Sequence, residues 1–427
     1  MTNNREGANN MEKFLETTMN GKRLFLLLAL VAIVSGAMAQ KYVLSGTVTN
    51  ETTGERIAQA TVSVPKTSLS VVTNDDGFFT LKTDEPPTAI VVSHLGYQSR
   101  QVKVPAVPTT PLGVRLKPAV VQLQEVVVWT ENPRELVNIA IKKIPENYIR
   151  QPELYSCFYR EAAMKRQHFI YVAEGVVDMY KTAYGHSSSK DRVAIRKGRR
   201  LLSPKRGDTL SVKVMGGPVQ PVQLDIAKNL DFLLNDADLN CYSFTLEQPE
   251  TIDDRMQYVV SLTPNADMPY ALFHGKLYID RETLAFTRAE LALDMNDREK
   301  ATRTMLVRKP AGVRFTPKEL STVIDYRHED GVTRISYVRN VFRFNCDWKR
   351  RLFATPFAAF CEMAVTDKTG EGIQPISGRN SFDTRDNFYD QVDYFRDPDF
   401  WEDYNIIEPT ESLDKAIDKL MKKTRTP

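Results

Sequence analysis

The sequence predicts a mainly β protein with two β-rich domains of different design. Short β-branched and aromatic runs alternate with turn residues over residues 42–117. Longer segments with a two-residue apolar alternation dominate residues 151–350, and few segments show helical periodicity. These patterns are typical of antiparallel strands. The chain has 427 residues, of which 42% are hydrophobic, so it can bury a sizeable core.

The overall charge excludes a strong global field. Lys and Arg number 57, and Asp and Glu number 54, which leaves a net charge of +3. An electrostatic role must therefore be local. We expect no nucleic-acid partner, because the chain also begins with an export signal.

Residues 1–39 have the features of a leader and a signal peptide. Lys22 and Arg23 precede the apolar run 24–34, and Ala37-Met38-Ala39 is a small-x-small cleavage site. We predict cleavage before Gln40 and a location in the periplasm or at the periplasmic face of the outer membrane. The alternative is an uncleaved anchor helix, but the run is short for a bilayer.

Whether Met1 or Met19 is the true start stays open. After Gln40 no second apolar run is long enough for a spanning helix, so we expect a peripheral rather than an integral membrane protein.

Residues 42–117 are expected to form a β-sandwich. The predicted strands are YVLSGTV, ATVSV, LSVVT, FFTL, AIVVSHL and RQVKV. Gly, Asn, Asp or Pro stands in each connecting turn, and Asp76-Gly77 is a strong hairpin signal.

Several spaced motifs of this region carry a resemblance. They are Gly46-Thr47-Val48, Thr53-Gly54, Ala60-Thr61-Val62, the segment TNDDGFF at 73–79, and SHLGY at 93–97. The region resembles the carboxypeptidase-regulatory-like, or transthyretin-like, domain of Bacteroidetes envelope proteins. The resemblance implies an immunoglobulin-like sandwich without catalytic activity. Gln59 and Asn74 depart from the residues usual in that family, Gly and Asp.

Residues 118–150 are predicted to be a linker followed by a short amphipathic helix. LKPAVVQLQEVVVW resembles the linker before the plug of TonB-dependent receptors. Asn132 can cap the following helix, Pro133 suits its first position, and Pro145 limits it. A plug does not follow, so an accessory role in a TonB-dependent uptake system is one alternative function.

Residues 151–350 are expected to form a strongly curved antiparallel sheet with a few helices. GKLYIDRETLAFTRAELALDM reads as a long hairpin with one apolar face, and Asp330-Gly331 marks another turn. The hairpin is similar to a strand pair of LolA-like and LolB-like half-barrels. PVQLDIAKNLDFLLN, residues 221–235, predicts the one clear helix of this region.

The segment 351–427 is aromatic and acidic, with a predicted C-terminal helix. Thr410 can cap that helix, and Leu413 begins its apolar stripe. The stretch resembles the ending of uncharacterised Bacteroidetes envelope proteins. Phe400, Trp401 and Tyr404 could line a ligand groove, although such residues more often attach a terminal segment to the body of the protein.

The sequence lacks the spacings that catalysis requires. None of the histidines 94, 168, 186, 274 and 328 has the partner spacing of a zinc carboxypeptidase. There is no G-x-S-x-G motif and no P-loop. We therefore expect no enzyme, no metal and no cofactor, with a cryptic hydrolase as an alternative because a triad is recognised only by its geometry.

The cysteines Cys157, Cys241, Cys346 and Cys361 lie far apart in sequence. An exported protein could pair them in three ways. Buried free thiols are the slightly favoured interpretation.

The densest charge lies within KDRVAIRKGRRLLSPKRG. It supplies a candidate contact for anionic head groups of lipids, formed by Arg196, Lys197, Arg199, Arg200, Lys205 and Arg206. A solvated loop is the simpler interpretation. The leading functional hypothesis is a non-enzymatic envelope protein that binds an apolar or extended ligand, a lipid or an acylated protein, in the concave face of the curved sheet.

Overall fold

The computed structural model describes residues 41–105, 110–119, 132–203, 205, 212–214, 216–348, 353–369, 372–394, 400–401 and 404–424. The predicted leader, the cleavage site before Gln40, the QLQEVVVW linker and Arg206 lie outside these ranges. Among the residues that are placed, no helix combines the length and the apolar character needed to cross a membrane.

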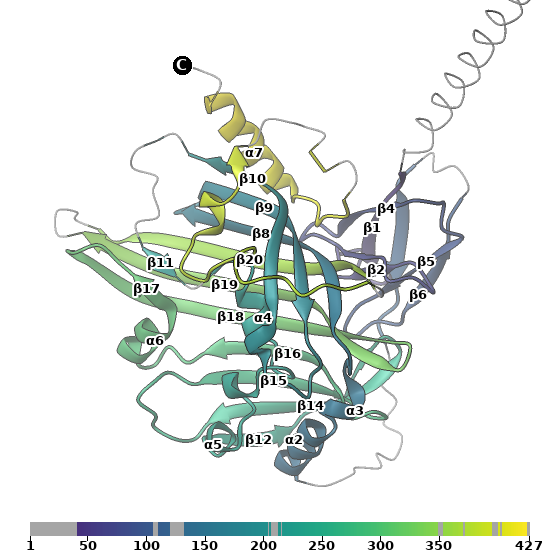
Figure 1. Cartoon of the computed structure of the whole chain (residues 1–427), viewed down its shortest axis with the longest axis horizontal. Helices are drawn as coiled ribbons and strands as arrows, with labels where there is room; N and C mark the ends of the chain where they lie inside the picture. The colour runs from purple at the N-terminus through teal and green to yellow at the C-terminus, as the bar shows by residue number, and fades with distance from the viewer. Residues whose placement is uncertain are drawn as a thin grey trace, which may run out of the picture.

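The N-terminal module is a sandwich of two small sheets (Figure 1). One sheet has the order β4-β1-β7 and the other β3-β2-β5-β6. The strands are β1 Tyr42–Asn50, β2 Thr61–Ser63, β3 Ser70–Val72, β4 Phe78–Thr83, β5 Ala89–Ser93, β6 Arg100–Lys103 and β7 Leu112–Leu116. Leu44, Phe79 and Ile90 are fully buried in its separate core. Period-two burial along β4 explains why the sequence pattern predicted these strands.

The turn before β4 is held by Asn74. Its Oδ1 accepts hydrogen bonds from the amides of Asp76 and Phe78, at 3.0 and 2.9 Å. Gly77 has φ +70°, a conformation that glycine adopts at little cost. Gln59, where the related family usually has Gly, also has a positive φ of 58°.

Two short helices follow, α2 Pro133–Lys142 and α3 Ile144–Asn147. The Asn132 side chain accepts from the amide of Arg134, so the predicted cap of α2 is present. Pro145 lies in the first turn of α3, where the missing amide costs nothing.

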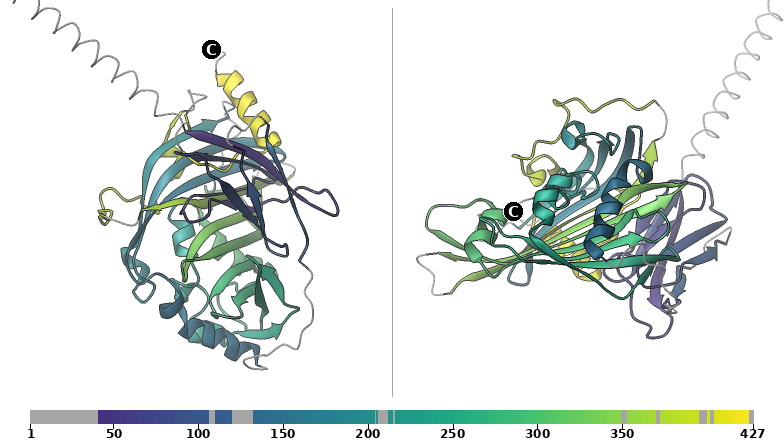
Figure 2. Two further views of the ribbon diagram at one scale, coloured as in Figure 1. Left: turned by 90° about the vertical axis from the view of Figure 1, so that its right-hand side faces the viewer. Right: turned by 90° about the horizontal axis from the view of Figure 1, so that it is seen from below.

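The main domain is a twelve-stranded, strongly curved sheet (Figures 1 and 2). Its order is β12-β14-β15-β16-β18-β19-β20-β8-β9-β10-β21, with β13 paired to β14. The strands are β8 Glu153–Lys165, β9 His168–Lys181, β10 Arg192–Leu202, β12 Tyr242–Leu246, β13 Glu250–Ile252, β14 Arg255–Pro264, β15 Phe273–Asp280, β16 Phe286–Leu293, β18 Val313–Glu329, β19 Val332–Trp348, β20 Thr355–Thr369 and β21 Asp393–Tyr394. The predicted mainly β fold with a sandwich and a larger curved sheet is confirmed.

Smaller elements complete the main domain. They are η2 Ser188–Lys190, β11 Lys213–Val214, α4 Gln220–Gln223, η3 Leu230–Phe232, α5 Asp236–Leu239, α6 Arg298–Met305, β17 Leu306–Arg308, η4 Phe388–Asp390 and α7 Glu411–Thr424. Strands β11 and β17 form a separate pair.

The two faces of the curved sheet have different coverings. On β8, Cys157 and Tyr159 point to the large core of the inner face, which also contains residues of α2 and of the segment 220–240. Phe158 and Ala162 point to the outer face. The module, residues 400–401 and 404–407, and α7 pack on that outer face.

The predicted single helix over 221–235 is wrong. The segment forms α4, then turns, then η3. Its side chains Leu224, Ala227 and Leu234 are nevertheless buried, as the helical pattern required. The chain bends at Asp225, whose side chain accepts from the amide of Lys228 and competes with helical hydrogen bonding.

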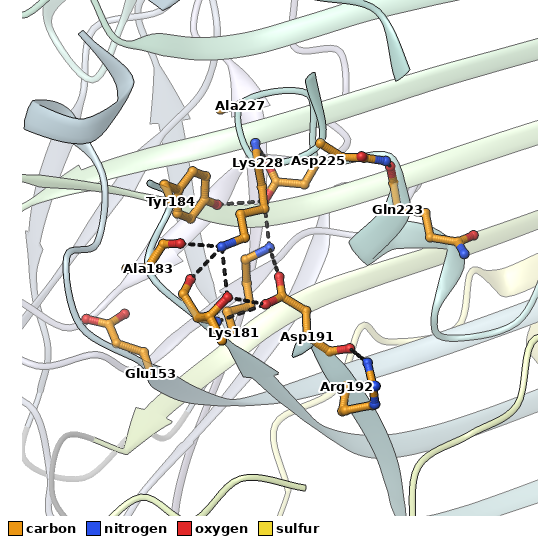
Figure 3. A network of polar contacts seen from close by, with 12 residues as sticks. Glu153, Lys181, Ala183, Tyr184, Asp191, Arg192, Gln223, Asp225, Ala227 and Lys228 are labelled. Atoms are coloured by element: carbon orange, nitrogen blue, oxygen red, sulfur yellow. Dashed lines mark hydrogen bonds and ion pairs between the residues drawn. The ribbon is translucent and has the colours of Figure 1, made fainter. Parts of the chain in front are cut away.

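Asp225 belongs to a buried polar network on the inner side of the sheet (Figure 3). Its carboxylate accepts from Lys181 Nζ at 2.7 Å, from the Tyr184 hydroxyl at 2.6 Å and from the Tyr326 hydroxyl at 2.8 Å. Lys181 and Asp225 are completely buried. The network therefore fixes the covering segment to the sheet rather than offering a site to solvent.

Candidate ligand-binding groove

Residues 400–401 and 404–407 pack onto the outer face of the sheet. Trp401 is 5% exposed and its ring meets Phe158 edge to face, with centroids 5.8 Å apart. The ring centroids of Phe400 and Trp401 lie 4.6 Å apart, and Tyr404 packs against the same cluster. The aromatic residues predicted as groove candidates thus take part in intramolecular packing.

Four of the predicted head-group contacts have partners within the chain. Arg199 pairs with the buried Glu174 at 2.9 Å, and its guanidinium lies over the Trp401 ring. Lys197 Nζ lies 4.3 Å from the centre of the Phe400 ring. Basic residues of 196–206 and aromatic residues of 400–404, which lie far apart in sequence, therefore meet in cation–π contacts.

The other described basic candidates lie next to different parts of the chain. Arg196 pairs with Asp178, and Arg200 lies 3.6 Å from Asp390. Lys205 borders a groove on the outer face.

A buried ion cluster lies beneath the docked segment. Arg160 is 2% exposed and contacts Glu174 at 2.7 Å and Glu362 at 3.2 Å. Its Nη2 also donates to the carbonyl of Ile407 at 2.6 Å. Burial raises the pKa of Glu174, but the charges of Arg160 and Arg199 outweigh it and keep that pKa below its ordinary value. The cluster joins the sheet to residue 407.

Helix α7 continues from this segment along the outer face. The hydroxyl of Thr410 accepts from the amide of Leu413 at 3.2 Å, as the predicted cap requires. Leu413, Ile417 and Leu420 are buried against Ala162, Val172 and Leu201. The helix therefore forms a wall that stands on the sheet.

A groove of about 610 Å³ opens between α7, the module turn 73–75 and the outer face of the sheet; we call it the outer groove. Its apolar lining consists of Met164, Phe169, Val341, Ala358, Ala359, Phe360, Ile407, Leu413, Ala416 and Leu420. Its cationic lining consists of Arg160, Lys205, Arg339, Arg343, Lys415 and Lys419, against the acids Asp75 and Glu362. The volume falls within the range of about 300–1,000 Å³ typical of ligand sites.

Several of these cations are already paired. Arg339 pairs with Asp75 and Arg343 with Glu319, whereas Lys415 pairs with Glu411 on α7. Lys205 and Lys419 make no ion pair within the described ranges. The outer groove therefore has an apolar floor and a positively charged rim.

The inner face, where the sequence predicts the ligand, is largely occupied by the chain's own side chains. A smaller space of about 230 Å³ remains there, which we call the inner cavity. It is bordered by Glu161, Tyr171, Phe342, Phe388 and Tyr389, among others.

The described part of the chain contains neither a histidine–carboxylate pair nor a cluster of metal ligands. No histidine there hydrogen-bonds to a carboxylate, since His94 contacts the Leu95 carbonyl and His328 the Thr333 hydroxyl. No group of three His, Cys, Asp or Glu side chains within the described ranges could hold a metal ion. The four cysteines are free and buried.

Comparison with protein families gives one match. Residues 44–128 match the model of the CarboxypepD_reg-like domain. The chain therefore carries a CarboxypepD_reg-like domain. The match ends eleven residues after the predicted boundary at residue 117, and it includes most of the predicted linker. No curated protein matches the chain.

Solved structures show only distant similarity. A DUF1329 family protein from Desulfovibrio piger is 10% identical with a TM-score of 0.24, covering 57% of this chain and 95% of its own. A domain from Vibrio parahaemolyticus, described as an outer membrane lipoprotein-sorting protein, is 10% identical with a TM-score of 0.26 and the same coverages. A membrane-associated protein of unknown function from Bacteroides fragilis is 12% identical with a TM-score of 0.15, covering 77% and 99%. At these scores we draw no argument from the similarity.

Proposed function

We propose that this chain is a non-enzymatic protein of the cell envelope that binds an anionic lipid in the outer groove. The observation that carries the proposal is the combination of an apolar floor with a lysine- and arginine-rich rim. An acyl chain gains free energy by leaving water for the floor, and a phosphate or carboxylate gains by pairing with the rim.

The positions of the charges favour an anionic head group over a neutral one. Lys205 and Lys419 lack ion-pair partners within the described ranges, while Glu362 and Asp75 are paired with arginines. A bound anion would therefore meet cations whose charge is not already neutralised. The predicted signal peptide, and the abundance of the CarboxypepD_reg-like domain in envelope proteins implied by the resemblance, support the location.

The first experiment identifies what the protein carries. The mature protein is purified from its native envelope and extracted with organic solvent, and the extract is measured by mass spectrometry. A stoichiometric phospholipid or lipopolysaccharide species supports the proposal. An acylated peptide in its place, or an empty protein that arrives with a receptor subunit, would contradict it and favour the acylated-protein or TonB-dependent alternative.

Variants of the groove lining test whether the lipid binds in the outer groove. Ala416 lines the groove from α7, whereas Asp418 on the same helix is exposed and does not line it. Ala416→Trp should fill the groove and abolish the bound lipid, while Asp418→Trp should retain it. Lys205→Gln with Lys419→Gln should weaken binding to phosphatidylglycerol vesicles more than to phosphatidylcholine vesicles. Equal lipid content in the two tryptophan variants would place the ligand elsewhere.

A further inference from the structure

The buried carboxylates of the described residues differ in whether they have a cationic partner. Six of them are more than nine-tenths buried: Glu161, Glu174, Asp191, Asp225, Asp280 and Glu362. Five have a cationic partner, provided by Arg160, Lys181, Arg199 or Arg255. Within the described ranges, Glu161 alone has none.

Glu161 is held in place without being neutralised. Its Oε2 accepts from the Tyr159 hydroxyl at 2.8 Å, and that hydroxyl accepts in turn from the amide of Gly217 at 3.0 Å. Leaving a carboxylate buried without a counter-charge is costly, so this group is not explained by stability. Burial is also the main reason why the pKa of Glu161 rises to about 7.

The surroundings of Glu161 are those of a small ligand site. The carboxyl borders the inner cavity of about 230 Å³, together with the rings of Tyr171, Phe342, Phe388 and Tyr389. Aromatic faces attract cations as well as apolar groups.

Within the described ranges no nearby cation forms an ion pair with this carboxylate, although the charge of Lys213 lowers its pKa. The Lys213 ammonium donates to the carbonyls of Arg385 and Asp386, at 2.6 and 3.2 Å. Arg308 is exposed at the border of the cavity, which also includes the acid Asp386. Asp386 offsets one of the two cations, and the positive charge that remains is not bonded to the carboxyl of Glu161.

We propose that the inner cavity binds an organic cation, a primary amine on an aromatic or short aliphatic group, with its ammonium against the carboxylate of Glu161. The ammonium would supply the missing counter-charge, and the organic group would contact the aromatic walls. The inner cavity and the outer groove share Ser203, Ala359 and Phe360 at their borders. Glu161 lines only the inner cavity and Arg160 only the outer groove, because residues of β8 alternate between the two faces.

The test compares phenethylamine with its neutral isostere phenethyl alcohol. Binding to the full mature protein is measured by calorimetry at pH 8, where Glu161 is mainly ionised. We expect the amine to bind at least tenfold more tightly than the alcohol, and Glu161→Gln to remove that preference. Equal binding of the two compounds, an amine affinity unchanged in Glu161→Gln, or no amine binding at all would overturn the proposal.

Two controls keep the result interpretable. The melting temperature and phosphatidylglycerol binding of Glu161→Gln test folding and the outer groove independently of the inner cavity. If that variant does not fold, Tyr389→Leu replaces it, since Tyr389 borders the cavity and is only partly buried. Tyr389→Leu should lower the amine affinity several-fold more than the alcohol affinity, and an equal effect on both would overturn the proposal.

Discussion

Arg339 of the curved sheet and Asp75 of the CarboxypepD_reg-like domain form a bidentate ion pair. Nη1 lies 2.6 Å from Oδ1 and Nη2 lies 2.9 Å from Oδ2. The two residues are 264 positions apart in sequence, so the pair ties the module to the outer face of the sheet and forms one end of the outer groove.

This pair should contribute modestly to stability. The Asp75 side chain is 49% exposed, which screens the interaction, so we expect a coupling energy of about 1 kcal/mol. A double-mutant cycle with Arg339→Met and Asp75→Asn in urea unfolding measures it. Additive effects of the two substitutions would show that the pair does not couple the domains.

Asn74→Asp should loosen the C-terminal segment while keeping the turn. The Asn74 amide donates to the carbonyl of Pro409 at 2.9 Å, which a carboxylate cannot do. The acceptor oxygen for Asp76 and Phe78 is preserved in aspartate. Hydrogen exchange should therefore become faster in residues 404–420 and stay unchanged in β4. Unchanged exchange in both segments would mean that the contact with Pro409 is unimportant.

Trp401→Ala should destabilise the protein by about 3 kcal/mol, because it removes a buried ring from the contact with Phe158. Trp401→Phe is the matched control. Within the described ranges the indole nitrogen has no hydrogen-bond partner, so phenylalanine loses little besides volume. Thermal unfolding measures both, and equal destabilisation would contradict the packing role.

The stability of the protein should depend on the pH through Glu161. The pKa of this carboxyl rises from 4.5 to about 7 on folding, so the folded state binds the proton more tightly. Its contribution to stability therefore falls as the pH rises from about 4.5 to about 7, by up to about 3 kcal/mol. The Tyr159 hydroxyl and Lys213 act against this shift.

Glu161→Gln should remove this decline. Urea unfolding at intervals between pH 4.5 and pH 8 compares the two proteins. The difference in unfolding free energy should grow in favour of the variant as the pH rises, and a constant difference would contradict the raised pKa.

The cysteines should be unreactive in the folded state. All four are buried, and burial raises the pKa of Cys346 and of Cys361 to about 12. A thiol reagent should therefore modify none of them in native buffer and all four in guanidinium. Fewer than four thiols in the denatured protein would reveal a disulfide.

The local patterns of the sequence determined most of the secondary structure. Alternating burial along β4 and β16 follows from the period of two, and the caps at Asn132 and Thr410 follow from short-range hydrogen bonding. Three segments are exceptions. In the segment 221–235, Asp225 bonds to Lys181 on a distant strand and overrides a helical pattern. The basic stretch, for which a solvated loop was the simpler interpretation, forms β10, and the predicted tail 351–427 contributes β20 to the sheet.

The sites depended on the tertiary structure. In the folded sheet Glu161 lies on the inner face and Phe360 on the outer face. The two-residue alternation of a strand gives no measure of which face keeps a space after the helices have docked. Likewise, the basic stretch and the aromatic tail were visible as separate compositions, and only the folded chain brought Arg199 over Trp401. Strand and cap preferences are set by neighbours a few residues away. Cavities, buried ion pairs and their missing partners are set by residues hundreds of positions apart.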